Sequence, residues 1–109
     1  MDYITFDDFQ KVDIRVGKVI QATDVNGSDK LLRLEVDFGE LGKKVIFSGV
    51  KPVYKPSDLE GKQFSFVVNI PPRHIMGEES QGMILEALDG DEYKITPLRE
   101  DITPGSRMC

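Results

Sequence analysis

The sequence predicts an all-β fold, and three observations support that prediction. Apolar and polar residues alternate over residues 32–38 and again over residues 64–70, as in strands with one buried face. One predicted helical turn, residues 56–61, interrupts the strands. The length of 109 residues suits one domain, which we expect to span residues 1–109. Together these features favour a five-stranded OB-fold barrel with short helices and terminal extensions, although the pattern alone also allows an SH3-like barrel or a small sandwich.

The chain opens with a short predicted helix followed by a long strand. Residues 5–9 begin with a threonine suited to cap a helix, and Phe6 and Phe9 are spaced to face one side of it. Residues 13–25 are rich in isoleucine and valine and predict the first strand. Gly17 interrupts this strand, which indicates a bulge or a tight bend.

Two further strands are predicted in the first half of the chain. Residues 26–29 have the composition of a turn, and the alternating run over residues 32–38 follows them. Residues 39–42 begin and end with glycine and predict the next turn. Residues 45–47 are apolar and predict the third strand, so three consecutive strands precede the helical turn.

The second half is predicted to complete the barrel. Residues 56–61 begin with proline and end with glycine, which indicates one helical turn. The alternating run over residues 64–70 predicts a fourth strand, ended by two prolines. Residues 73–81 are polar and are predicted to form a loop. Residues 83–88 and 93–96 predict two more short strands around a turn.

Composition excludes several classes of protein. The only cysteine is Cys109 and the only histidine is His74, which excludes a disulfide framework and a zinc site of these two residue types. No apolar run approaches the length of a membrane span, and the acidic N-terminus does not resemble a signal peptide, so we expect a cytoplasmic protein without a membrane partner. The net charge of −5 argues against a protein that binds nucleic acids strongly and without sequence preference. We expect no cofactor.

No arrangement of residues predicts catalysis, and the informative residues fall into two clusters. Lys30 opens the second strand and Arg33 lies on its polar face, where an OB-fold would direct both at phosphates. The second cluster supplies amides, a hydroxyl, a cation and groups able to pack on a base: Asn69, Arg73, His74, Ser80, Gln81 and Met83. Each also has an ordinary interpretation as a solvated charge, a turn residue or a core side chain.

Several short runs, in order, resemble one known family. They are FDDFQKVDIRVGKV at residues 6–19, SDKL at 28–31, DFG at 37–39, SGV at 48–50, GK at 61–62, NIPPR at 69–73 and ESQGMIL at 79–85. Over residues 4–109 the chain is similar to the tRNA-binding domain at the C-terminus of methionyl-tRNA synthetases, which also occurs as free-standing dimeric tRNA-binding proteins.

The resemblance implies an OB-fold that binds tRNA by shape, without catalysis of its own, as an auxiliary subunit or C-terminal domain of methionyl-tRNA synthetase. It implies a homodimer through the N-terminal helix around Phe6 and Phe9 and the C-terminal segment, residues 95–108. The tRNA-binding residues carried over by position are Lys30, Asn69, Arg73, Ser80, Gln81 and Met83. Arg33 is added from the strand pattern.

A related branch offers the alternative function. Dimeric CsaA-type export chaperones share the opening F-x-x-x-D-I-R-x-G and are thought to bind unfolded polypeptide. They differ from this chain by lacking the DKL and S-Q-G-M runs. The resemblance therefore favours tRNA binding, while the acidic composition departs from the basic members of the family.

Overall fold

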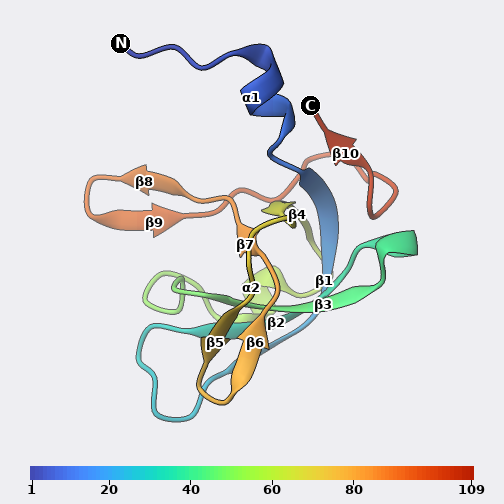
Figure 1. Cartoon of the computed structure of the whole chain (residues 1–109). Helices are drawn as coiled ribbons and strands as arrows, with labels where there is room; N and C mark the ends of the chain where they lie inside the picture. Colours follow the sequence, from blue (N-terminus) through green and yellow to red (C-terminus); the bar gives the residue numbers. More distant parts are fainter.

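The computed structural model describes all 109 residues and is mostly β (Figure 1). Its helices are α1 (Phe6–Gln10), the 3-10 helix η1 (Gly39–Leu41) and α2 (Pro56–Leu59). Neither α-helix has the length or hydrophobicity that crossing a membrane requires. The strands are β1 (Ile14–Asp24), β2 (Leu32–Asp37), β3 (Lys43–Ser48), β4 (Gln63–Val67), β5 (Arg73–Ile75), β6 (Glu78–Ser80), β7 (Met83–Ile84), β8 (Ala87–Asp89), β9 (Glu92–Lys94) and β10 (Arg107–Met108).

Five antiparallel strands form a nearly closed barrel, as the OB-fold prediction required. Their order is β3-β2-β1-β4-β7. The short strand β10 pairs with Ile14 and Arg15 of β1, before the part of β1 that pairs with β2. Residue Gln81, just before β7, closes the gap to β3. Its backbone N–H donates to the Val45 carbonyl at 2.8 Å, and its side-chain Oε1 accepts from the Val45 N–H at 3.0 Å. The barrel therefore leaves little exposed edge between its last strand and its third.

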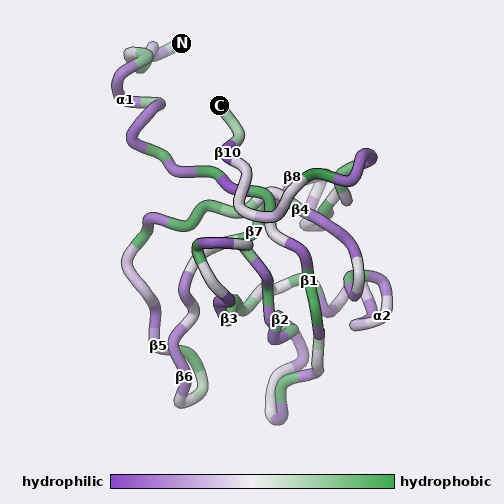
Figure 2. The backbone as a smooth tube through the Cα atoms, turned by 90° about the vertical axis from the view of Figure 1, so that its right-hand side faces the viewer, coloured by the Kyte–Doolittle hydropathy of each residue, from purple (hydrophilic) through white to green (hydrophobic).

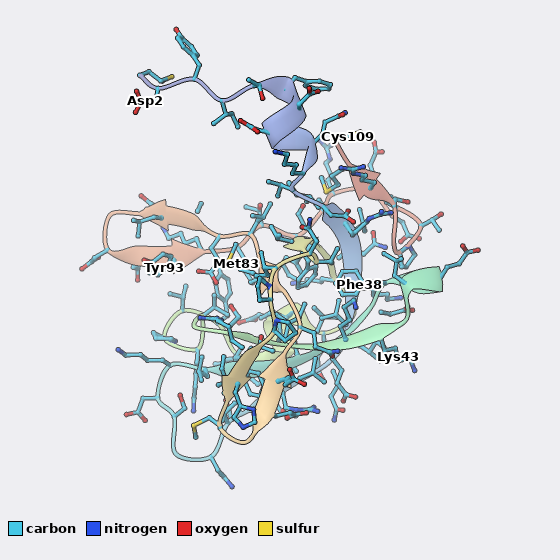
Figure 3. The ribbon with its side chains drawn as sticks, viewed as in Figure 1. Asp2, Phe38, Lys43, Met83, Tyr93 and Cys109 are labelled. Carbon is cyan, nitrogen blue, oxygen red and sulfur yellow. The ribbon has the colours of Figure 1, made fainter.

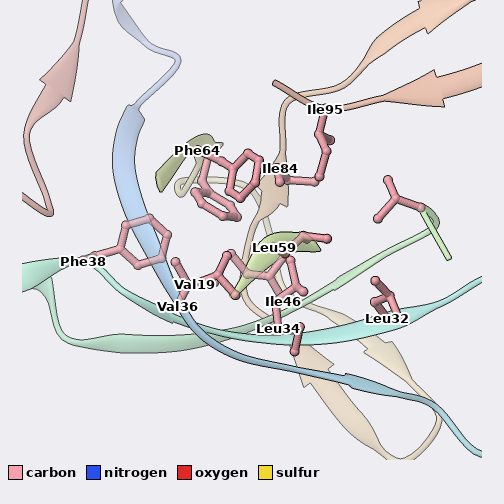
Figure 4. Close-up of a cluster of buried hydrophobic side chains, with 13 residues drawn as sticks. Val19, Leu32, Leu34, Val36, Phe38, Ile46, Leu59, Phe64, Ile84 and Ile95 are labelled. Atoms are coloured by element: carbon pink, nitrogen blue, oxygen red, sulfur yellow. The ribbon is translucent and has the colours of Figure 1, made fainter. Parts of the chain in front are cut away.

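The core is built from the inward faces of these strands. In β2 every second residue is buried, which confirms the alternation in the sequence. Phe38 and Phe66 meet edge to face, with ring centroids 5.3 Å apart. Figure 4 shows the buried cluster, which consists of Val19, Ala22, Leu32, Leu34, Val36, Phe38, Ile46, Val50, Leu59, Phe64, Phe66, Ile84 and Ile95.

Gly17 is required by packing, and the predicted bulge lies elsewhere. A Cβ atom on Gly17 would lie 2.5 Å from Val36 Cγ1, 2.7 Å from Phe38 Cε1 and 2.8 Å from Phe66 Cδ1. The register of β1 against β2 slips between Val19 and Gln21 instead, which leaves Ile20 as the extra residue. A glycine in a strand marks either a bulge or a close approach, and here it marks the close approach.

The prediction of a loop over residues 73–81 is wrong. This segment forms the β5–β6 hairpin, in which Arg73 pairs with Ser80 and Ile75 with Glu78. Met76 and Gly77 connect the strands with φ of 52° and 85°, the positive values of the tight turn that suits hairpin twist. Little of the hairpin is buried, so both strands are polar and show no alternation of apolar and polar residues in the sequence.

Two strand boundaries also differ from the prediction. The fourth strand ends at Val67 rather than at residue 70. The single strand expected over residues 83–88 divides into β7, which belongs to the barrel, and β8, which pairs with β9 in a separate hairpin. The chain leaves the barrel between them and the second hairpin projects outward (Figure 1).

The terminal segments bond to residues at or near the ends of β4: the C-terminal segment to Gln63 and the N-terminal segment to Asn69, two residues after the strand. The helix α1 begins as predicted, with Thr5 Oγ1 accepting from the Asp8 N–H, but it buries no residue. Near the C-terminus, Gln63 Oε1 accepts from the Ile102 N–H at 2.9 Å. Phe6 is 71% exposed, and Figure 2 shows the N-terminal segment standing apart from the barrel with hydrophobic positions along it.

Candidate functional site

The β5–β6 hairpin, β7 and the β8–β9 hairpin border a groove of about 320 Å³. We call it the Arg73 groove. Six hydrophobic side chains line it: Leu31, Phe47, Met83, Ile84, Leu85 and Tyr93. The other lining residues are Ser48, Gly49, Arg73 and Glu86. Met83 is 42% exposed and Tyr93 50% exposed, and Figure 3 shows both on the same side of the molecule. The groove thus combines an apolar surface with one cation and one carboxylate.

Lys30 lies next to this groove on a loop that internal bonds hold in place. Ser28 Oγ accepts from the N–H groups of Lys30 and Leu31. Lys51 donates from Nζ to the Ser28 carbonyl at 3.0 Å, and its backbone N–H donates to the Lys30 carbonyl. Lys30 and Arg73 are both exposed and take part in none of the ion pairs of the structure. Their charges are therefore available to an anionic ligand.

Arg33 has a partner within the protein. Its Nε and Nη2 donate to the two carboxylate oxygens of Glu78, each at 2.8 Å, and Glu35 lies 3.7 Å away. These hydrogen bonds, with the attraction between the charges, lower the pKa of Glu78 and raise that of Arg33. The pair joins β2 to the β5–β6 hairpin. Arg33, which the sequence predicted to contact phosphate, thus already binds Glu78.

Ser80 and Gln81 also make internal contacts. Ser80 is 2% exposed, and its Oγ accepts from the Phe47 N–H at 3.0 Å. Gln81 is exposed but pairs with Val45 through both backbone and side chain. Both residues attach the end of β6 to β3. Because β6 pairs with β5, they also position Arg73, which lies on β5 opposite Ser80.

Asn69 joins β4 to the N-terminal segment. Its Oδ1 accepts from the Asp13 N–H at 2.8 Å, and its Nδ2 donates to the Lys11 carbonyl at 2.6 Å. Both amide ends are therefore used, although the residue is exposed. Of the seven predicted site residues, the groove contains Arg73 and Met83, and Lys30 adjoins it.

Sequence reasoning did not single out Glu86 or Tyr93 as site residues. Glu86 is the one acid inside the apolar run over residues 83–88, which was the available signal. Ser48 Oγ donates to its Oε1 at 3.0 Å. Tyr93 shares the second hairpin with Lys94, and nothing in the local pattern separates it from a surface tyrosine. No group of three or more histidine, cysteine, aspartate or glutamate residues in the structure is placed to hold a metal ion.

Comparison with known proteins decides the family. Residues 14–107 match the family model described as "Putative tRNA binding domain". The chain belongs to this tRNA-binding domain family. It is 45% identical over 105 residues to the methionine–tRNA ligase of Thermotoga maritima, covering 96% of this chain and 16% of the ligase. It is 45% identical over 106 residues to that of Porphyromonas gingivalis, covering 96% of this chain and 15% of the ligase. The tRNA-binding domain thus spans a small part of these relatives.

Solved structures agree with the fold. The domain superposes on a MetRS-related protein from Pyrococcus horikoshii with a TM-score of 0.94 and 36% identity over the full length of both chains. A CsaA chaperone from Bacillus anthracis gives 0.88 and 30% identity, covering 99% of this chain and all of the other. The MetRS-related protein and the CsaA chaperone therefore share one architecture with this chain.

Proposed function

We propose that this domain is a non-catalytic module that binds tRNA by shape. The observation that carries the proposal is the family match over residues 14–107, which includes the β5–β6 hairpin and Lys30. The two unpaired cations, Lys30 and Arg73, offer phosphate contacts beside an exposed apolar groove. Met83 supplies a surface on which a base can pack.

The charges of the site predict weak, salt-dependent binding. Since Glu78 engages Arg33, Lys30 and Arg73 remain for the ligand, and we expect them to neutralise about two phosphates. The slope of log K against log salt should then be about −2. Binding of unfractionated tRNA across a salt series, with duplex RNA and single-stranded DNA as competitors, tests this. Absence of tRNA binding even at low salt would refute the proposal.

Two variants locate the binding face. Lys30→Ala and Arg73→Ala should each weaken tRNA binding and reduce the salt slope by about one. Lys55→Ala is the matched control, because Lys55 is exposed at the start of α2 and its side chain forms no ion pair. An equal effect of all three substitutions would show that binding follows total charge rather than this face.

We further propose that the domain acts in the cytoplasm with methionyl-tRNA synthetase, as an auxiliary subunit or as one of its domains, and that it forms a homodimer. The support is the similarity to the ligases and the exposed apolar side chains of the N-terminal segment, where Tyr3 is 91% and Phe6 71% exposed. Sedimentation of the wild type and of Phe6→Asp tests the dimer. A wild-type monomer at micromolar concentration would refute it.

A second candidate is binding of unfolded polypeptide. It is favoured by the 30% identity and full-length superposition with the CsaA chaperone, together with the apolar lining of the Arg73 groove. Peptide binding should be nearly independent of salt and indifferent to Arg73→Ala. Suppression of aggregation of an unfolded protein, without tRNA binding, would support this function instead.

A further inference from the structure

We propose that the Arg73 groove holds one unstacked nucleobase of the bound RNA and that Glu86 makes it selective for guanine. The inference rests on the proposed function and names a subsite within it. It starts from an unusual combination: a carboxylate and a guanidinium share one apolar groove without pairing with each other.

The groove has the volume and the surface that a base needs. Its volume of about 320 Å³ is at the lower end of the range for small-molecule sites. Tyr93 and Met83 are each about half exposed, so a flat ring can pack on them without displacing the core. Stacking of unpaired bases on aromatic side chains is the usual mode of recognition of single-stranded RNA.

Glu86 is exposed, one hydrogen bond orients its carboxylate, and it keeps acceptor capacity. The hydroxyl of Ser48, a residue only 3% exposed, donates to Oε1 at 3.0 Å. A carboxylate accepts up to about four hydrogen bonds, so Oε2 remains free. Because Glu86 is negative, it disfavours a phosphate inside the groove. A neutral base with N–H donors is the better occupant.

Guanine fits this combination better than the other bases. It carries two adjacent donors, N1–H and the N2 amino group, which match the two oxygens of a carboxylate. Its O6 is an acceptor, and the Arg73 guanidinium, which carries five N–H donors, can donate to it while still facing a neighbouring phosphate. Adenine offers a donor beside an acceptor on the corresponding edge. A peptide lysine would meet Glu86 favourably but would be repelled by Arg73, which favours RNA over peptide in this groove.

The test uses the full chain, labelled with ¹⁵N, titrated with guanosine, inosine and adenosine 5′-monophosphates. We expect the amides of Leu85 and Tyr93 to shift, with guanosine monophosphate bound about tenfold more tightly than adenosine monophosphate. Inosine monophosphate, which lacks the N2 amino group, should fall between them. Glu86→Gln should abolish this preference or reverse it, since a glutamine amide pairs well with adenine. Tyr93→Ala should weaken all three about tenfold, whereas Tyr93→Phe should not.

Binding of tRNA by the same variants separates the two proposals. If the wild type binds tRNA but the nucleotides bind equally, or elsewhere, or independently of Glu86, the base subsite is refuted and the tRNA module stands. If the wild type binds no tRNA, the proposed function fails first. If the groove amides shift with a lysine-containing peptide and not with nucleotides, the groove belongs to a polypeptide ligand and the inference is wrong.

Discussion

Replacing Ser80 by alanine distinguishes a scaffold residue from an RNA contact. The Ser80 hydroxyl is buried and accepts the backbone N–H of Phe47 at 3.0 Å. Alanine leaves that N–H without an acceptor between β3 and the hairpin, where Phe47 itself is only 6% exposed. An unsatisfied buried donor costs about 1–3 kcal/mol. The second contact of Ser80, to the Gly82 carbonyl at 3.5 Å, is too long to add much.

The expected result is a loss of stability with tRNA affinity nearly retained. Urea unfolding of Ser80→Ala should shift its midpoint down by about 1 M. Hydrogen exchange of the Phe47 amide should be faster than in the wild type. Ser57→Ala, at an exposed position in α2, is the control and should change stability by less than about 0.5 kcal/mol.

The opposite pattern would refute the reasoning. If Ser80→Ala unfolds at the same urea concentration as the wild type but binds tRNA much more weakly, the hydroxyl contacts the ligand. The interior hydrogen bond would then contribute nothing measurable. The affinity for tRNA is measured in buffer without denaturant, where the wild type and Ser80→Ala are both folded. The effect on affinity is then separate from the effect on stability.

Three further predictions concern other parts of the scaffold. Gly17→Ala should destabilise the fold by about 1–3 kcal/mol, since its Cβ would overlap three core side chains, whereas Gly49→Ala, with open space around it, should be nearly neutral in urea unfolding. Asn69→Ala should lower the free energy of unfolding by about 1 kcal/mol and speed hydrogen exchange of the Asp13 amide. Unchanged exchange would contradict a role of Asn69 in holding the N-terminal segment. Because Arg33 lowers the folded-state pKa of Glu78, their pair stabilises the fold above the ordinary carboxyl range, and this stabilisation is lost as the pH falls through the lowered pKa. Glu78→Gln should therefore be less stable than the wild type near pH 7, with the two converging in acid; a constant difference would rule out this linkage.

Local patterns predicted the barrel well because its strands are half buried. The alternation of β2 follows directly from one face meeting the core, and Thr5 caps α1 through a bond that spans only three residues. The β5–β6 hairpin was not predicted, because its turn, Met76-Gly77, lacks the usual Asn-Gly signal and its strands are polar.

Site roles were harder to predict because residue type does not reveal a distant partner. Asn69 bonds to Lys11, 58 positions away, and Ser80 to Phe47, 33 positions away. Arg33 meets Glu78 only after the hairpin folds over β2. A polar residue in a family motif can therefore serve the binding surface indirectly, by fixing the strands that carry Arg73.

Both chain ends lie at one end of the molecule, and the tip of the β5–β6 hairpin lies at the other (Figures 1 and 2). Gln63, the first residue of β4, and Asn69, two residues after its end, anchor the C-terminal and N-terminal segments. A fluorescent protein or an enzyme fused to either terminus would thus stand away from the Met76-Gly77 tip of this hairpin. A protein joined at either terminus would therefore share the end of the molecule that carries α1 and leave the opposite end, with the hairpin tip, uncovered.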